Sequence, residues 1–294
     1  MISLGGILKP QYFFRPRQIL RRILRELRPN PGRDIITLPW GARIEVDTRD
    51  TVGQAIALQG LYDIVTSEVL WRLTAAGDIT LDVGANVGYF TSLLARRAGR
   101  SGKVLAFEPY PATFAVLQRN AKLQGSHSAR IQSYQVALSN IDGDASLDLF
   151  AGQECNTSYA FLTQKPSAAS IPVRVSRADR YVKQNQEVGV LKIDAQWHEA
   201  RVLEGFGTRL VSGKIRDVVF EEESPYPAES HKILLDAGYS IFWFAEHFRG
   251  PRMIPPTAKH APKRPYDITP SYLATLDSVR AQKRLSAHGW QCLS

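Results

Sequence analysis

Cysteine and long apolar runs are what this sequence has least of. Its 294 residues include only two cysteines, Cys155 and Cys292, which are too few for a disulfide scaffold and show no metal-ligand spacing. No run of about eighteen apolar residues occurs, so we expect no membrane-spanning helix. The short apolar start before Lys9 and Pro10 is followed by no small-residue cleavage site, which argues against a secretory signal. These absences favour a globular protein in a reducing, cytoplasmic setting.

Acidic residues are almost missing from the N-terminal arm, which we define as residues 1–33. Eight basic residues and one acid, Glu26, give this arm a charge of +7, out of +9 for the whole chain. The rest of the chain is therefore nearly neutral, at +2. A neutral body lacks the basic surface that nucleic-acid binding requires, so we expect no nucleic-acid partner.

The arm contains a predicted amphipathic helix at residues 16–28. Its apolar residues recur at helical spacing, with arginines between them: Ile19, Leu20, Ile23, Leu24 and Leu27. A basic amphipathic helix suits an anionic lipid surface, so residues 15–28 are candidates for peripheral contact with the inner face of a membrane. Packing of the arm on the domain and formation of a homodimer are the alternatives.

Residues 34–294 predict a single α/β domain. A hairpin is expected from residues 35–38 and 43–46, and a helix around 67–74. Apolar strands then alternate with helices, a pattern typical of a parallel sheet joined by right-handed crossovers. The expected strands cover residues 79–83, 104–107, 131–136, 190–193, 217–220 and 240–244. Residues 140–176 predict an antiparallel insertion near the sheet edge, and residues 245–270 a long loop that could fold over an acceptor as a lid.

A glycine turn follows the first of these strands. Gly84 permits a sharp turn, and Gly88 removes a side chain where the next helix approaches the strand. Glu108 ends the second strand, where a carboxylate can accept hydrogen bonds from both hydroxyls of a ribose. The carboxyl edge of the sheet is therefore predicted to bind a nucleoside-containing ligand.

Asp82 and Asn86 bear on which ligand binds there. Asn86 stands where the Gly-x-Gly-x-x-Gly pattern of dinucleotide-binding proteins has its second glycine. Asp82 adds a carboxylate that would repel a pyrophosphate and attract the sulfonium and amino groups of S-adenosylmethionine. The sequence thus favours S-adenosylmethionine. An NAD-dependent oxidoreductase and a nucleic-acid-modifying methyltransferase are the alternatives.

Taken together, these segments resemble the FkbM-type methyltransferases, from about residue 50 to about residue 274. The matching segments are 81–91 (LDVGANVGYFT), 107–109 (FEP), 136–139 (VALS), 192–194 (KID) with Glu199, and 202–205 (VLEG). The resemblance implies a Rossmann-like class I fold with a mostly parallel seven-stranded sheet and helices on both faces. It also implies an S-adenosylmethionine-dependent O-methyltransferase that acts on a hydroxyl of a carbohydrate, glycan, natural product or other small molecule.

Seven residues are the candidates for binding the cofactor. The resemblance adds Tyr62, from segment 60–63 (GLYD), and Ala137, whose segment faces the adenine in the family. The complete set is Tyr62, Asp82, Gly84, Asn86, Gly88, Glu108 and Ala137.

Methyl transfer to a hydroxyl requires an aligned acceptor and a group that takes its proton. The catalytic candidates are Asp194 at the end of the fourth strand, His198 at the beginning of the following helix and Glu221 at the end of the fifth strand. A helix cap is the alternative role for Asp194, and a solvent-facing position the alternative for His198. A divalent metal could be held by Asp194, Glu221 and a histidine, although no local spacing requires one.

The chain departs from the family beside these candidates. Gln196 and Trp197 occupy the positions of the family's usual acid and glycine. The change indicates a specialised acceptor pocket, because an indole beside a cleft can stack on the apolar face of a sugar or aromatic ring. Burial in the core is the alternative for Trp197.

Overall fold

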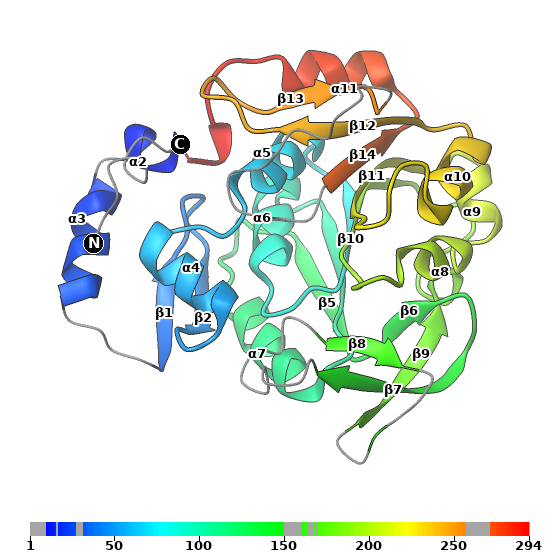
Figure 1. Ribbon diagram of the computed structural model, residues 1–294, viewed down its shortest axis with the longest axis horizontal. Helices are drawn as coiled ribbons and strands as arrows, with labels where there is room; N and C mark the ends of the chain where they lie inside the picture. Colours follow the sequence, from blue (N-terminus) through cyan, green and yellow to red (C-terminus); the bar gives the residue numbers. More distant parts are fainter. Residues whose placement is uncertain are drawn as a thin grey trace.

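A mostly parallel sheet forms the centre of the molecule (Figure 1). The computed structural model describes residues 10–15, 17–27, 32–149, 160–163, 167, 170–256 and 271–293. Across these residues the sheet has eight strands, and the order is β13 (Arg252–Ile254), β12 (Ser240–Ala245), β14 (Ser271–Thr275), β11 (Ile215–Glu221), β10 (Val188–Ile193), β3 (Ile79–Val83), β4 (Lys103–Phe107) and β5 (Arg130–Tyr134). The α/β fold with a mostly parallel sheet is confirmed.

The expected count of seven strands is wrong for this sheet. β11, β10, β3, β4 and β5 are parallel neighbours, whereas β14, β12 and β13 join antiparallel at one edge. The additional strand is β13, which is only three residues long and lies in the segment expected to be loop. A strand that short carries no period-two pattern that a sequence could reveal.

Helices cover both faces of the sheet, as expected. α5 (Ile64–Leu73) and α6 (Tyr89–Ala98) pack on one face, and α8 (Glu199–Glu204) and α10 (Glu229–Asp236) lie on the other (Figure 1). Successive strand residues divide between the two cores because side chains alternate across a strand. In β10, Val190 belongs to the core under α6, and Leu191 to the core under α8. The remaining helical segments of this body are α7 (Pro111–Lys122), α9 (Thr208–Val211), α11 (Ser278–Leu285) and the 3₁₀ turns η2 (Ala178–Arg180) and η3 (Gln291–Leu293).

The predicted hairpin and arm helix are both present. β1 (Arg33–Thr37) pairs antiparallel with β2 (Arg43–Asp47), and α3 (Arg17–Leu27) follows the short α2 (Pro10–Phe14). α4 (Thr51–Gln59), which was not predicted, packs against β2 of the hairpin and against α3.

Residues 137–177 build a second, smaller sheet. Its strand order is β6 (Ala137–Ser139), β9 (Ile171–Arg177), β7 (Gly143–Leu149) and β8 (Ala160–Thr163). β7 runs antiparallel to β8 and β9, as expected of the insertion, while β6 is parallel to β9. The insertion therefore forms a sheet of its own and does not extend the main one.

The C-terminal segment is held by one buried ion pair. The carboxylate of Glu68 accepts hydrogen bonds from the backbone N–H groups of Gln291 and Cys292 at 2.8 and 2.7 Å. Arg72 pairs with Glu68 and donates to the carbonyl oxygens of residues 287 and 289. Cys292 is buried in the core, and this burial raises the pKa of its thiol.

Part of the predicted lid lies outside the described residues. Of segment 245–270, the structure describes residues up to 256, including β13. His260 and the other residues from 257 to 270 lie outside the description, as does Cys155. Within the described ranges, none of the helices has the length and apolar character needed to cross a bilayer.

Candidate functional site

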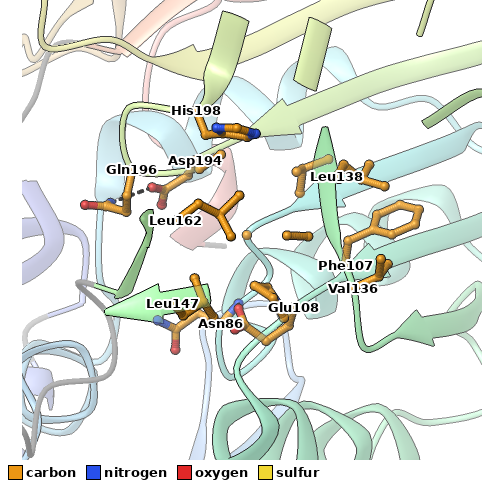
Figure 2. A pocket seen from close by; sticks show the side chains of 15 residues that line it. Asn86, Phe107, Glu108, Val136, Leu138, Leu147, Leu162, Asp194, Gln196 and His198 are labelled. Atoms are coloured by element: carbon orange, nitrogen blue, oxygen red, sulfur yellow. Dashed lines mark hydrogen bonds between the residues drawn. The ribbon is translucent and has the colours of Figure 1, made fainter. Parts of the chain in front are cut away.

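A cavity opens at the carboxyl ends of β3, β4 and β10 (Figure 2). It contains about 630 Å³ of empty space, part of which is continuous with solvent. In Figure 2 the labelled Asn86 and Glu108 lie at one side of this cavity, and Asp194, Gln196 and His198 at the other.

Gly84 fixes the floor of the cavity. Its φ is +70°, and a β-carbon at this position would lie 1.8 Å from the carbonyl oxygen of Asp194. The two strand ends approach this closely because the backbone N–H of Asp194 donates to the carbonyl of Val83 at 3.1 Å. Glycine is therefore required by contact between backbones as well as by the turn.

Gly88 has a different neighbour from the one expected. Its φ is +90°, and a β-carbon there would lie 2.8 Å from a methyl carbon of Leu117 in α7. We expected Gly88 to allow the next helix to approach the strand. Instead, it allows α7 to approach the turn. Gly88 supports the cavity from outside and is not among the residues that line it.

Glu108 and Asn86 form a connected pair on the cavity wall. One carboxylate oxygen of Glu108 accepts from the backbone N–H of Asn86 at 2.9 Å, and the other accepts from Tyr110 N–H at 2.9 Å. Asn86 has a φ of +49°, which turns its backbone N–H toward the carboxylate. Burial raises the pKa of Glu108 to about 7. Each carboxylate oxygen keeps a further lone pair, so Glu108 can still accept hydrogen bonds from a bound ligand.

Asp82 is not on the cavity surface. Its side chain is fully buried, and Oδ2 accepts from the hydroxyl of Thr91 at 2.5 Å. Lys192 Nζ lies 3.5 Å from the other oxygen, Oδ1. The expected contact between Asp82 and a cofactor is therefore corrected. Its carboxylate points into the protein, toward a buried ammonium group.

Lys192 links this interior to the cavity. Its ammonium group donates to the carbonyl oxygen of Gly84 at 3.0 Å and lies 3.5 Å from Asp194 Oδ2. Burial alone would lower the pKa of Lys192, but the charges of Asp194, Asp82 and Glu221 raise it overall. The lysine therefore stays protonated and holds the ends of β3 and β10 together.

An apolar slot forms the wall beside Glu108. Phe107, Val136 and Leu138 come from β4 and the segment around β6, and Ala137 lies among them as expected. The small sheet closes the slot, because Leu147 of β7 and Leu162 of β8 also line it (Figure 2). A slot with apolar walls and a carboxylate at its edge fits a flat heterocycle joined to a hydroxylated sugar.

Asp194 and His198 lie together on the other side of the cavity. Asp194 Oδ1 accepts from the side-chain amide of Gln196 at 3.0 Å, drawn as a dashed line in Figure 2. The Nε2 atom of His198 lies 3.0 Å from the hydroxyl oxygen of Ser139. Burial lowers the pKa of His198, and nearby Arg201 lowers it further, so the imidazole is neutral at pH 7.

The turn after β10 has an unusual backbone. Gln196 and Trp197 have φ values of +49° and +67°, a region that favours glycine. Trp197 is 52% exposed, donates from Nε1 to Glu223 at 2.8 Å and contacts the ring of Phe161 edge-on. Glu199 closes the turn by accepting from the backbone N–H of Ala195 at 2.9 Å. Trp197 therefore lies exposed in the turn, between two residues that line the cavity, and is not a core residue.

Two further candidates lie apart from the cavity lining, as Asp82 and Gly88 do. Tyr62 is 39% exposed and packs edge-on against Tyr89. Glu221 ends β11 opposite Ser271 of β14, and its charge helps to raise the pKa of Lys192. Among the described residues, no cluster of three or more histidine, cysteine, aspartate or glutamate side chains could hold a metal ion.

Three of the residues now placed in the site were not identified from the sequence. Lys192 had a signal, since a lysine inside an otherwise apolar strand (VGVLKI) must find buried anionic partners. Leu147 and Leu162 had none, because only the folding of the small sheet brings them to the cavity.

The chain matches the family model of the methyltransferase FkbM domain over residues 82–241. It is 30% identical over 144 residues to methyltransferase 1 of Beauveria bassiana (strain ARSEF 2860), a match that covers 42% of this chain and 57% of that protein. It is 27% identical to methyltransferase sdnD of Sordaria araneosa over 192 residues, covering 55% and 73% of the two chains. The chain thus spans little more than half the length of the first of these relatives.

A solved structure is also similar. It is a SAM-dependent O-methyltransferase from Thermotoga maritima, with 15% sequence identity and a TM-score of 0.43. The match covers 86% of this chain and 80% of that one.

The contact at Gly84 predicts a large effect of one methyl group. We expect Gly84→Ala to lower the free energy of unfolding by at least about 3 kcal/mol, because the new β-carbon would overlap the Asp194 carbonyl. Gly213 is a matched control, with the same φ of +70° and only an ordinary contact 3.7 Å from the added carbon. Gly213→Ala should lower the free energy of unfolding by about 1–2 kcal/mol, the effect of the positive φ alone. Urea denaturation measures both, and equal losses would contradict the role assigned to Gly84.

Proposed function

The chain belongs to the FkbM methyltransferase family, and from this we propose that it transfers a methyl group from S-adenosylmethionine to a hydroxyl of a carbohydrate or other small polar acceptor. One observation carries the proposal, namely that a single cavity holds Glu108 at the end of β4 and Asp194 at the end of β10. The first is suited to a nucleoside and the second to a hydroxyl that must lose its proton.

The donor half of the proposed site is the slot beside Glu108. The carboxylate of Glu108 would accept hydrogen bonds from the two ribose hydroxyls, and Val136 and Leu138 would flank the adenine. These residues fit S-adenosylmethionine, since the apolar walls of the slot suit the adenine and the carboxylate of Glu108 at its edge suits the ribose. When bound, S-adenosylmethionine supplies an electrophilic methyl group on a sulfonium.

Asp194 is the proposed proton acceptor on the other side. Lys192 and Gln196 each contact one of its oxygens, which fixes the carboxylate in one orientation. His198 is less suited, because its Nε2 is engaged by the hydroxyl of Ser139. Glu221, outside the cavity lining, would help to keep Lys192 charged.

Trp197 is the proposed platform for the acceptor. Its neighbours in the turn, Gln196 and His198, both line the cavity, and the indole is fixed at the rim by Glu223 and Phe161. An indole fixed in this way offers its face to the apolar side of a sugar ring. The positive φ of Trp197 costs about 1–2 kcal/mol relative to an ordinary backbone. Retention of a strained aromatic residue beside a cavity is consistent with a binding role.

The oxidoreductase alternative is not supported by this family assignment. The argument against NAD that began from Asp82 does not stand, because that carboxylate is buried against Lys192. The preference for a methyl donor now depends on the family assignment and on the slot at Glu108.

The catalytic proposal predicts a specific defect in Asp194→Asn. We expect the rate of transfer of labelled methyl groups from S-adenosylmethionine to a panel of monosaccharides and glycosides to fall about 100-fold or more, since the amide cannot take the proton. The affinity for S-adenosylhomocysteine should change little. Asp236→Asn, at the exposed end of α10, is the control and should transfer at the normal rate. Normal transfer by Asp194→Asn would contradict the assignment.

Glu108 predicts a pH-dependent cofactor affinity. In the free protein its pKa is raised to about 7 by burial, so the carboxyl group is mostly protonated at about pH 6. Ribose hydroxyls bind the ionised form better, so the affinity for S-adenosylhomocysteine should rise about tenfold from about pH 6 to about pH 8. Calorimetric titrations across this range measure the effect.

Two variants identify the group responsible for this dependence. Glu108→Gln should bind weakly with no dependence on pH. Glu199, whose pKa burial also raises to about 7, does not line the cavity, so Glu199→Gln should keep the dependence. If the pH dependence persisted in Glu108→Gln and disappeared in Glu199→Gln, Glu199 and not Glu108 would be the group that titrates, and the prediction would be wrong.

The proposed platform predicts that two replacements of Trp197 differ in stability but not in binding. Both Trp197→Gly and Trp197→Leu should raise the KM for a glycoside acceptor about tenfold, the value of one stacking contact of about 1.4 kcal/mol. The glycine variant also loses the strain and should be more stable than the leucine variant by up to about 1 kcal/mol. An unchanged KM in both variants would remove Trp197 from the acceptor site.

A further inference from the structure

α3 faces the domain with its polar side. The side chain of Gln18 is buried, and its amide donates to the carbonyl oxygen of Leu58 at 3.3 Å. A β-carbon on Gly60 would lie 2.8 Å from the same side chain, so α3 and the end of α4 are in close contact. Arg25, two turns further along α3, pairs with Asp34 of the hairpin at 2.8 Å. Polar groups therefore attach this helix to the protein.

Three leucines of the apolar stripe of α3 are exposed. Leu20, Leu24 and Leu27 follow one another at spacings of four and three residues, so they share one side of the helix. Their exposures are 61%, 54% and 74%. A surface helix of a globular protein normally turns such a stripe toward the core. Here the arrangement is reversed, and Figure 1 shows α3 at one end of the molecule, with α4 on its inner side.

A second exposed apolar group lies on the adjoining helix. Phe13 and Phe14 of α2 are 64% and 41% exposed, and the ring of Phe13 contacts that of Phe248 at 5.0 Å. Phe248, in the loop after β12, is itself 49% exposed. Exposed apolar groups of this size, on consecutive helices, mark an interaction surface.

The charge of the same segment selects the partner. α3 contains four arginines and one glutamate, and the whole arm carries +7. Exposed leucines and phenylalanines beside arginines match an anionic bilayer, where the apolar side chains enter the boundary between headgroups and acyl chains and the arginines lie at the phosphates. A symmetric contact between two copies would instead bring two +7 arms together.

We propose that α2 and α3 form a docking surface for anionic phospholipid, with Leu20, Leu24 and Leu27 as the inserted residues. Gln18 and Arg25 keep the helix attached to the domain in the orientation that presents this stripe. The surface would hold the protein at a membrane through side chains of α2 and α3. It is independent of the methyl-transfer proposal, and no step of its test uses catalysis.

Co-sedimentation of the full chain with vesicles tests the proposal. We expect at least about tenfold stronger binding to phosphatidylcholine vesicles that contain phosphatidylglycerol than to pure phosphatidylcholine, because each basic residue near an anionic surface adds about fivefold. Added salt should weaken the binding. The triple variant Leu20→Gln, Leu24→Gln, Leu27→Gln should lose about tenfold or more in affinity, and glutamine preserves helix propensity.

A control variant and a second measurement complete the test. Val279→Gln with Leu235→Gln changes exposed apolar residues on other helices and should bind vesicles normally. Hydrogen exchange on the unmutated chain should show the amides of residues 17–27 protected by anionic vesicles. Equal binding to both vesicle types, or unchanged binding by the triple variant, would overturn the proposal. So would a dimer in solution that the triple variant converts to monomer while its vesicle binding is unchanged.

Discussion

The contact between the ends of β3 and β10 is the constraint on which the rest of the site depends. The carbonyl oxygen of Asp194 occupies the space where a side chain at residue 84 would begin. This approach places the Gly84 carbonyl within reach of Lys192, and the lysine in turn lies beside Asp194 and Asp82. Gly84 and the ammonium group of Lys192 therefore determine where the turn toward Asn86 starts and where the carboxylate of Asp194 is positioned.

The two sides of the cavity are built from different structural features. On the side of Glu108, the small sheet adds an apolar wall. On the side of Asp194, Gln196 and Trp197 both have a positive φ. Strain of this kind persists only where surrounding contacts hold it, here those to Asp194 and Glu223.

Local patterns predicted the features that depend on neighbours in sequence. The arm helix, the hairpin, the alternating strands and the position of Glu108 all follow from periodicity and turn residues. Asp82 was misjudged because strand periodicity does not say which face of the sheet a strand-end residue meets, and only the packing of Lys192 decides it. Leu147 and Leu162 depend on contacts made through the small sheet, and the anchoring of the C-terminus by Glu68 depends on residues more than 220 positions away. No local signal carries such information.

The central claim is that Glu108 and Asp194 bound the donor and acceptor ends of one binding site. A crystal structure of the chain with S-adenosylhomocysteine tests it most directly. We expect the ribose hydroxyls within hydrogen-bond distance of Glu108, the adenine between Val136 and Leu138, and the sulfur directed toward Asp194. A ligand whose ribose lies away from Glu108, or whose sulfur points away from Asp194, would contradict the account.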